Sequence, residues 1–458
     1  MTGRFIDGQG QPTGSTDFAK FVLAEAAGSF DQALAAEILA ESNWRKNYQQ
    51  YFRRFSWLEL SHPEVADRAL AAMGQHYQDE QGQSPYAQAL RGFQSREAFD
   101  FEAVVGTRLK RPIVLPSSAS GLTEQQATID ALRSLDFVRA NPNLDLSNDL
   151  LVAIAGNAEL SGARDWLSWG GSVALIARKN DRALQRLIDH AKTSAGTLYF
   201  VAEGLDPISQ IENCGAFVRQ LSTLGKRMVF ASYGYAPGSK QIELQIAQDA
   251  ILSVALNLPK QQLAFSWLGT PLDVIAANPE IVRQQIAAYR GRGFTTKLRD
   301  FFWQIFGELK PAEPEIDGEL EVGIFDASAN RQGPSYLLAK HSERWRALVA
   351  ARQGALVSFT VAPPAETTSV LGAKKVLART YRGLRKLGVN PLPAADTATL
   401  MAGILARNLH DELAPTRSWR GSTAAELASL TSATSIHAGL WTMPYRIDSI
   451  WVAATVIG

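Results

Sequence analysis

The segment "DLLVAIAGNAELSGARDWLSWGGSVALIARKN" (149–180) contains two short apolar runs separated by a turn and a helix-like stretch. The runs "DLLVAIAG" (149–156) and "SVALIARKN" (172–180) are almost continuously apolar at their centres, which is typical of strands covered on both faces of a parallel sheet. Between them, "SGARDWLSWGG" (161–171) opens with small residues and closes on glycines, so we expect a helix there. The segment therefore predicts a strand–turn–helix–strand unit of an α/β fold.

The same alternation of helix-like and strand-like segments continues towards the C-terminus. We expect helices at 181–196 and 208–225, and strands at 197–207 ("TLYFVAEGLDP") and 226–234 ("KRMVFASYG"). Because crossovers between parallel strands are right-handed, these elements predict a doubly wound parallel Rossmann-type sheet, whose ligands bind at the carboxyl ends of the strands. The apolar run "FSWLGTPLDVI" (265–275) is an alternative for the fourth strand.

The chain divides into two predicted parts. Residues 1–145 are expected to form a helical N-terminal region with a loop-rich connector, because residues 17–110 have few strand formers and apolar residues at helical spacing. Residues 146–458 are expected to form the Rossmann-like domain, which carries an insertion at about 241–318 and a helical, aromatic C-terminal segment. The insertion includes a long helical stretch through "TTKLRDFFWQIFGEL" (295–309).

Composition and charge narrow the range of partners. The chain has 458 residues, of which 46% are apolar and 20% charged, and its 46 Lys and Arg against 45 Asp and Glu give a net charge of +1. This balance gives no electrostatic basis for nucleic acid or an anionic membrane as the main partner. For the same reason we expect the basic and aromatic segment "NWRKNYQQYFRRFSW" (43–57) to be a charged helix with an aromatic core face, and not a nucleic-acid-binding segment. The single cysteine, Cys214, excludes an internal disulfide and fits a reducing compartment. With no apolar run of membrane-spanning length, the sequence predicts a cytoplasmic protein.

The turn after the first strand has the placement of a dinucleotide site. A glycine ends the strand, and small residues open a helix whose N-terminal amides would face a pyrophosphate. The residues concerned are Gly156, Asn157, Ser161, Gly162 and Ala163. Their spacing is not G-x-G-x-x-G, so a tight strand-to-helix turn without a ligand is the alternative.

The end of the second strand bears on which dinucleotide would bind. A carboxylate there would hydrogen-bond an adenosine ribose and select NAD, whereas a cation would pair with the 2′-phosphate of NADP. The sequence has Arg178 and Lys179 at this point, and Asp181 comes one step too late to be the obvious ribose ligand. These residues favour NADP, and the alternative is a solvated pair of basic residues.

The segment "GPSYLLAK" (333–340) places Tyr336 and Lys340 four residues apart, on one face of an expected helix. A nearby ammonium lowers the pKa of a phenol, so Tyr336 could exchange a proton with a substrate oxygen near neutral pH, while Lys340 could also bind the nicotinamide ribose. Ser328, at the end of the strand-like "LEVGIFDAS" (320–328), could hold the substrate carbonyl. Such a set suits carbonyl reduction by hydride transfer from a cofactor.

From about residue 149 to about residue 370, the chain resembles the short-chain dehydrogenase/reductase family. "SVALIARKNDRALQRL" looks like that family's second strand and helix, and "IFDAS" followed by "YLLAK" resembles its catalytic strand and helix. "FASYGYAPG" (230–238) resembles the strand and loop that usually carry Asn-Asn-Ala-Gly, which implies a cofactor contact at Ser232. "VAPPAETTS" (361–369) resembles the family's Pro-Gly turn and the threonine that holds the nicotinamide carboxamide, which implies Thr367 or Thr368.

The resemblance implies an NADP(H)-dependent oxidoreductase that reduces a carbonyl or oxidises the alcohol, with Ser328, Tyr336 and Lys340 as catalytic residues. In this sequence Ser328 precedes Tyr336 by eight residues, which is closer than the family's serine usually lies. A catalytically inactive binding or assembly subunit of the same fold is therefore the alternative, and an enoyl reductase on the same scaffold is chemically close.

The substrate and partners are less sharply indicated. The C-terminal "HAGLWTMPYRIDSIW" (437–451) either packs on the core or lines a pocket for a bulky apolar substrate, such as an acyl, polyketide or terpenoid group. The histidines show no metal-ligand spacing, so we expect no metal, and we expect His341, next to Lys340, to be a surface helix residue. A homo-oligomer is compatible with the sequence.

Overall fold

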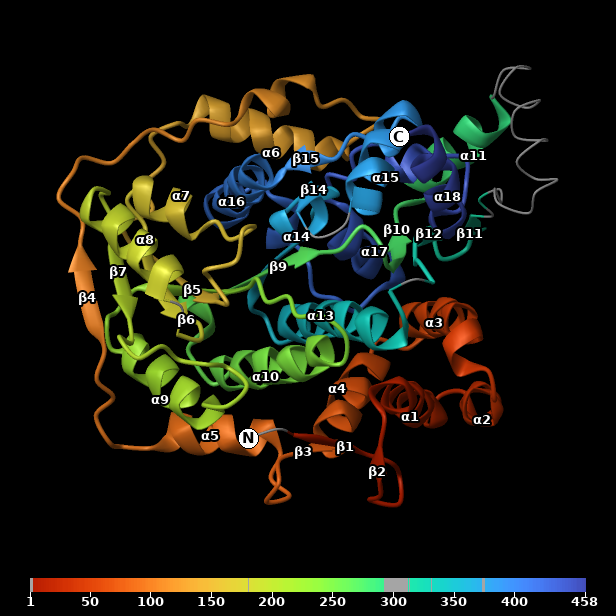
Figure 1. Cartoon of the computed structure of the whole chain (residues 1–458), viewed down its shortest axis with the longest axis horizontal. Helices are drawn as coiled ribbons and strands as arrows, with labels where there is room; N and C mark the ends of the chain where they lie inside the picture. Colours follow the sequence, from red (N-terminus) through yellow and green to blue (C-terminus); the bar gives the residue numbers. More distant parts are fainter. Residues whose placement is uncertain (1–2, 180, 292–311, 313, 331, 373–374) are drawn as a thin grey trace.

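The computed structural model describes residues 3–179, 181–291, 312, 314–330, 332–372 and 375–458. At its centre lies a sheet of seven strands (Figure 1). In spatial order these strands are β13 (Leu356–Val361), β9 (Leu263–Gly269), β8 (Arg227–Ser232), β5 (Asp149–Ile154), β6 (Ser172–Ile176), β7 (Thr197–Phe200) and β4 (Glu102–Val105). The helix expected through 295–309 falls outside the described residues.

Six strands of this sheet are parallel, and the seventh, β4, pairs antiparallel with β7 at the edge. Numbered along the chain, the parallel strands lie in the order 3-2-1-4-5-6, which is the strand order of dinucleotide-binding Rossmann sheets. The prediction of an α/β fold with a mostly parallel sheet is therefore confirmed, and the arrangement is compatible with a Rossmann-like fold. The fourth parallel strand is β8, and the run 265–275 contributes to the fifth, β9.

Both faces of the central sheet are covered by apolar side chains, which explains why its strands are almost continuously apolar. On β5, Leu150, Val152 and Ile154 pack in one core with α9 (Ile211–Ser222), α10 (Lys240–Ala255) and α13 (Pro334–Arg352). The alternating Leu151 and Ala153 pack in a second core with α7 (Ala163–Ser168), α8 (Asp181–Lys192) and α16 (Ala394–His410). Burying each such leucine or isoleucine contributes about 1.5–3 kcal/mol.

The N-terminal region is built mainly of helices. They are α1 (Ser15–Gly28), α2 (Gln32–Ala40), α3 (Trp44–Ser61), α4 (Val65–Gln75) and α5 (Pro85–Gln94), beside a small sheet of β1 (Arg4–Ile6), β2 (Pro12–Thr13) and β3 (Tyr77–Gln78). As expected from 43–57, α3 buries aromatic residues, including Tyr48, Phe52 and Phe55, and these share a core with Leu337 and Trp345 of α13. The helical expectation for 17–110 is wrong at its end, because β4 joins the central sheet.

A second, antiparallel sheet follows β9. Its strands, in spatial order, are β10 (Val274–Ala277), β12 (Val322–Asp326) and β11 (Glu315–Asp317), and α11 (Pro279–Arg290) comes after β10. The segment 320–328 therefore contains a strand, as predicted, but this strand is not part of the central sheet. The resemblance had given it the place of a central-sheet strand before the helix of Tyr336, whereas the fifth parallel strand of that sheet is β9.

The remaining elements surround this framework. They are η1 (Ser117–Gly121), α6 (Ile129–Ala140), η2 (Lys260–Gln262), the paired β14 (Ala365–Glu366) and β15 (Leu392–Pro393), α14 (Thr368–Leu371), α15 (Lys375–Lys386), η3 (Pro415–Arg417), α17 (Ala424–Ser432), η4 (Leu440–Thr442) and α18 (Ile447–Ile457). Trp441 and Tyr445 are buried in the core beside Phe325, so the C-terminal aromatic segment packs on the core at these two residues. Within the described ranges, no helix combines the length and apolar character of a membrane-crossing segment.

Candidate active site

The carboxyl ends of the central parallel strands meet at one edge of the sheet. Ile154, which ends β5, lies opposite Ile176, which ends β6, and opposite Ser232, which ends β8. On the next strands, Val361 of β13 lies opposite Gly269 of β9. The predicted cofactor residues follow or end these strands, and they are Gly156, Asn157, Ser161, Gly162, Arg178, Lys179, Ser232, Thr367 and Thr368. The fold therefore brings residues from distant parts of the sequence to one edge.

Tyr336 lies at this same edge, in the first turn of α13. Thr270, which directly follows β9, is near enough to act on the phenol as a hydrogen-bonding group, and this acts to lower the pKa of Tyr336. Lys340, one turn further along α13, acts electrostatically on the tyrosine. Burial raises the pKa of Tyr336, and the opposing effects of Lys340 and Thr270 do not cancel this rise. Both residues are partly buried and keep some exposed surface.

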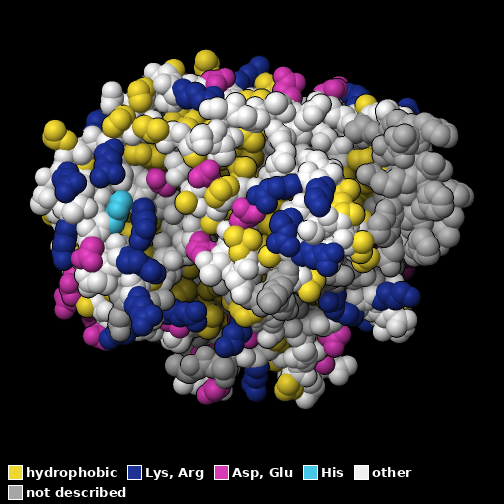
Figure 2. Space-filling model, turned by 45° about the horizontal axis from the view of Figure 1, so that its top comes forward, with side chains coloured by type: hydrophobic (Ala, Val, Ile, Leu, Met, Phe, Trp, Pro, Cys, Tyr) yellow, Lys and Arg dark blue, Asp and Glu magenta, His cyan; other side chains and the backbone are white. Residues whose placement is uncertain are grey.

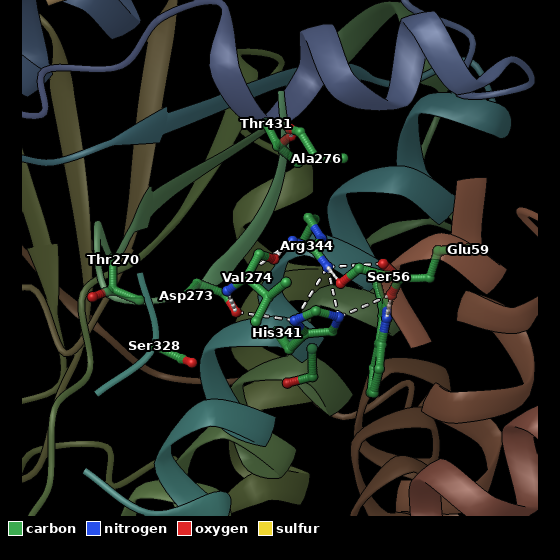
Figure 3. Close-up of polar contacts among 12 residues, drawn as sticks. Ser56, Glu59, Thr270, Asp273, Val274, Ala276, Ser328, His341, Arg344 and Thr431 are labelled. Carbon is green, nitrogen blue, oxygen red and sulfur yellow. Dashed lines mark hydrogen bonds and ion pairs between the residues drawn. The ribbon is translucent and has the colours of Figure 1, made fainter. Parts of the chain in front are cut away.

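The strand that precedes Ser328, β12, belongs to the second sheet and not to the central one. The hydroxyl of Ser328 donates to Asp326 Oδ1 (2.5 Å) and accepts from Gln49 Nε2 (2.9 Å), and the Ser328 carbonyl accepts from the same amide (2.8 Å). Ser328 is thus a buried link to the N-terminal region. Thr270 and Ser328 come from separate segments (Figure 3).

Thr270 was missed at the sequence level, although a signal for it was present. The run "LAFSWLG" (263–269) is strongly apolar and ends in glycine, which marks a buried strand with a polar residue after it. The signal was weak because β10, α11 and β12 separate Thr270 from Tyr336 along the chain. Only the paired strands show that the two residues meet.

Lys340 forms a buried ion pair with Glu343 on the same helix. Nζ of the lysine lies 2.7 Å from Oε1 of the glutamate, whose side chain is 2% exposed. Burial raises the pKa of Glu343, and Lys340 offsets this only in part. Burial acts to lower the pKa of Lys340, but Glu343 and Tyr336 outweigh it and the pKa is raised. The lysine therefore carries a positive charge beside Tyr336 at neutral pH.

A second buried ionic cluster lies on the side of α13 that faces α3 (Figure 3). The two ring nitrogens of His341 lie 3.0 Å from Asp273 and 3.1 Å from Glu59, and Arg344 lies 2.8 Å from Glu59. Trp345 also donates to Glu59. His341 has no exposed surface, so the expectation of a surface residue is wrong. Its partners come from α3 and, through Asp273, from the residue directly before β10, which the local sequence does not reveal.

The charges of this cluster stabilise one another. Burial acts to raise the pKa of Glu59, but Arg344 and His341 outweigh it and lower the pKa to about 2. Burial and Arg344 act to lower the pKa of His341, but Glu59 and Asp273 outweigh them and raise it. Arg344, His341 and two carboxylates are therefore held together in the interior, where ion pairs are little screened.

The turn after β5 is sterically tight. Ala155 has a positive φ of 55°, and a Cβ on Gly156 would lie 2.5 Å from the Cβ of Ala153. A Cβ on Gly162 would lie 2.8 Å from the Cβ of Ala402, so this glycine lets α16 approach the start of α7. Both glycines are thus required by packing within the chain, which agrees with a tight turn and is also compatible with a close approach of a cofactor.

The loop after β13 contacts this turn. Thr368 donates to the carboxylate of Glu159 through its backbone nitrogen (2.8 Å to Oε2) and through its hydroxyl. Thr367 directly precedes α14 at the same place. The structure therefore joins the two segments in which the sequence placed pyrophosphate and nicotinamide contacts.

The remaining predicted cofactor residues lie at the ends of β6 and β8. Arg178 is exposed, and Lys179, also exposed, pairs with Glu203 (2.7 Å). Figure 2 shows Lys and Arg side chains on the left of the face, in the region of α7 and α8. Ser232 is buried, and its hydroxyl has no hydrogen-bond partner among the described residues. Arg178 is thus an exposed cation at the sheet edge that a dinucleotide could use, whereas the hydroxyl of Ser232 is enclosed by the protein.

A cavity of about 710 Å³ lies away from this edge, between α4, the β3 turn and the C-terminal half of α13. Two charged residues line it: Asp67 pairs with Arg352 (2.5 Å), and Arg346 is bound by both oxygens of Asp249 (2.7 and 2.8 Å), of which Oδ2 also accepts from Tyr86 (2.6 Å). None of the site residues predicted from the sequence lines this cavity, so the sheet edge is the candidate that the sequence and the fold indicate together.

The chemistry available at the sheet edge is that of a phenol, an ammonium and a hydroxyl. Across the described ranges, no three His, Cys, Asp or Glu side chains are grouped so that they could hold a metal ion. The chain matches no protein-family model, and no curated protein matches its sequence.

Proposed function

We propose that this protein is an NADP(H)-dependent oxidoreductase of the short-chain dehydrogenase/reductase type that reduces a carbonyl compound. The observation that supports this most is the group formed by Tyr336, Lys340 and Thr270. A phenol with a hydroxyl partner and an ammonium, beside the end of a central parallel strand, is the set that proton transfer to a carbonyl oxygen requires. In this proposal Thr270 takes the role that the sequence suggested for Ser328.

The proposed mechanism assigns one task to each side chain. The cofactor, when bound, supplies the hydride that adds to the carbonyl carbon. Thr270 holds the substrate oxygen next to Tyr336, and the phenol donates its proton as the electron pair of the C=O bond moves to that oxygen. The Lys340 ammonium stabilises the phenolate that remains.

The residues at the sheet edge are compatible with NADP. In a doubly wound sheet of this strand order, dinucleotides bind across the carboxyl ends of the strands. Arg178 would pair with the 2′-phosphate, the turn at Gly156 and Asn157 would approach the pyrophosphate, and Ser232 would offer its unpartnered hydroxyl. Thr367 and Thr368 would face the nicotinamide side.

A titration with NADPH and with NADH tests the proposal. The chain has ten tryptophans, so energy transfer to a bound nicotinamide gives a readable signal. We expect NADPH to bind in the micromolar range, and Arg178→Ala to weaken NADPH binding by about tenfold or more while NADH binding changes little. Arg133→Ala, which removes an exposed arginine of α6, is the charge-matched control and should leave binding unchanged. No binding of either cofactor would rule out the reductase.

One observation favours the second candidate, a catalytically inactive binding or assembly subunit of the same type. Glu159 places a carboxylate in the turn where a pyrophosphate would lie, and it is bound to Thr368. A negative charge there opposes the binding of a second one. The same titration separates the two candidates, because the inactive subunit need not bind NADPH.

A further inference from the structure

We infer that Glu343 is a positioning residue that holds the Lys340 ammonium in a buried ion pair and so limits how strongly this ammonium stabilises the phenolate of Tyr336, which favours reduction over alcohol oxidation. The direction of the reaction rests on the proposed function. The electrostatic effect of Glu343 and Lys340 on Tyr336 involves only residues of the protein, so it can be measured without cofactor or substrate.

The geometry of the ion pair carries this inference. Glu343 follows Lys340 by three residues on α13, and the charged atoms lie 2.7 Å apart. The side chain of Lys340 is 13% exposed and that of Glu343 is 2% exposed, so water and salt screen the pair weakly. The lysine therefore divides its positive charge between a buried carboxylate and the phenol of Tyr336.

The carboxylate of Glu343 is placed at an energetic cost. Its second oxygen, Oε2, is buried and has no hydrogen-bond partner among the described residues. A buried carboxylate with an unsatisfied oxygen destabilises a fold unless a nearby cation compensates its charge. The neighbouring ammonium of Lys340 is the group on which this charge acts most directly.

The groups that face Tyr336 from the surrounding elements act in both directions. Lys340 and Glu343 act on it from α13, Tyr235 from the loop after β8, and Tyr381 from α15. Asp273, directly before β10, acts on the Lys340–Glu343 pair. Burial raises the pKa of Tyr336 most, Lys340 and Thr270 lower it, and Glu343 and Tyr235 raise it again. The net result is a phenol that is protonated at neutral pH.

A protonated Tyr336 suits one direction of the reaction. In reduction a C–H bond forms at the carbonyl carbon, the C=O π pair moves to oxygen, and this oxygen takes the phenolic proton. The phenolate then regains a proton from water, which reaches the partly exposed side chain. In oxidation the phenol would first have to be deprotonated, which the nearby Glu343 carboxylate opposes.

A pH titration of the full-length chain by NMR tests the inference. The ring carbon that bears the hydroxyl is ¹³C-labelled in all eleven tyrosines, and the spectrum of Tyr336→Phe identifies the signal of Tyr336. We expect Glu343→Gln to move the titration midpoint of Tyr336 to lower pH by about one unit, because the amide removes the negative charge and releases Lys340 towards the phenol. Glu343→Asp, which withdraws the carboxylate, should move it in the same direction by less.

The controls make each outcome decisive. Lys340→Met should move the midpoint to higher pH, and Glu412→Gln, at a glutamate whose side chain is 85% exposed, should leave it in place. Unchanged signals of the other tyrosines show that each variant is folded. The inference is overturned if the midpoint stays or rises in both Glu343 variants, or if Lys340→Met has no effect. If the protein does not bind NADPH but shows these shifts, the proposed function is contradicted and the inference about Glu343 stands.

Discussion

Thr270 and Ser328 are the two hydroxyl residues considered for holding the substrate oxygen, and they differ in their surroundings. Thr270 follows a strand of the central sheet and acts on Tyr336 as a nearby hydrogen-bonding group. Ser328 is 3% exposed, and its hydroxyl is occupied on both sides by Asp326 and Gln49. A hydroxyl that already donates and accepts within the fold is poorly placed to hold a substrate.

The pair Thr270→Ala and Ser328→Ala tests this distinction. We expect Thr270→Ala to lower kcat/KM for NADPH-dependent reduction of a carbonyl substrate by about tenfold or more, because the phenol loses its partner. Ser328→Ala should leave kcat/KM within about twofold and lower the free energy of unfolding by about 1 kcal/mol, the worth of a buried hydrogen bond. Both are measured by NADPH oxidation and urea unfolding. The reverse pattern would return the role to Ser328.

At the scale of secondary-structure elements, α13 is held from two sides. One side carries the Lys340–Glu343 pair at the sheet edge, and the other carries His341 and Arg344, which pair with Glu59 of α3. A cluster of this kind fixes the rotation of a helix about its axis, because each charged group needs its own partner. The position of Tyr336 therefore depends in part on α3.

The contribution of Glu59 should depend on pH. Its folded pKa of about 2 lies below its ordinary value of 4.5, so its stabilisation is complete above about pH 4.5 and is lost as the pH falls towards 2. We expect Glu59→Gln to lower the free energy of unfolding by about 3 kcal/mol at pH 7 and by less at pH 3.5. Urea unfolding at the two pH values measures this, with Glu124→Gln as an exposed control. An equal loss at both pH values would contradict the assignment.

At the scale of the whole molecule, the N-terminal region shares a hydrophobic core with α13 and contributes a strand to the central sheet. Aromatic residues of α3 lie in one core with Leu337 and Trp345 of α13, and β4 completes the edge of the central sheet. The sequence-based division at residues 145 and 146 therefore does not separate two independent cores.

Removal of the N-terminal region tests this shared core. A chain of residues 146–458 would expose the apolar side chains of α13 and leave the edge of β7 unpaired, so we expect it to be insoluble or to bind a hydrophobic dye strongly. Circular dichroism, dye binding and size-exclusion chromatography compare it with the full chain. A soluble, monomeric fragment with a native spectrum would show that 146–458 folds independently.

How far the sequence predicts this structure depends on the range of the interactions involved. The runs 149–156 and 172–180 could be recognised as strands because apolar character is a local signal. The run 320–328 was also recognised as a strand, but its sheet depends on which distant strand pairs with it. Likewise, Thr270 meets Tyr336 and His341 becomes buried only through the path of the chain, which no local pattern records.

The contacts of Glu59 also have a consequence for the order in which the protein is made. Its partner Trp345 lies 286 residues further along the chain. At a synthesis rate of about 5–20 residues per second, roughly 15 to 60 s pass between the two. During that interval α1 to α4 have left the ribosome, but the helix that completes their core does not yet exist. The region that is synthesised first is therefore among the last to complete its hydrophobic core. Its apolar side chains stay uncovered in the nascent chain, so this region needs protection from aggregation.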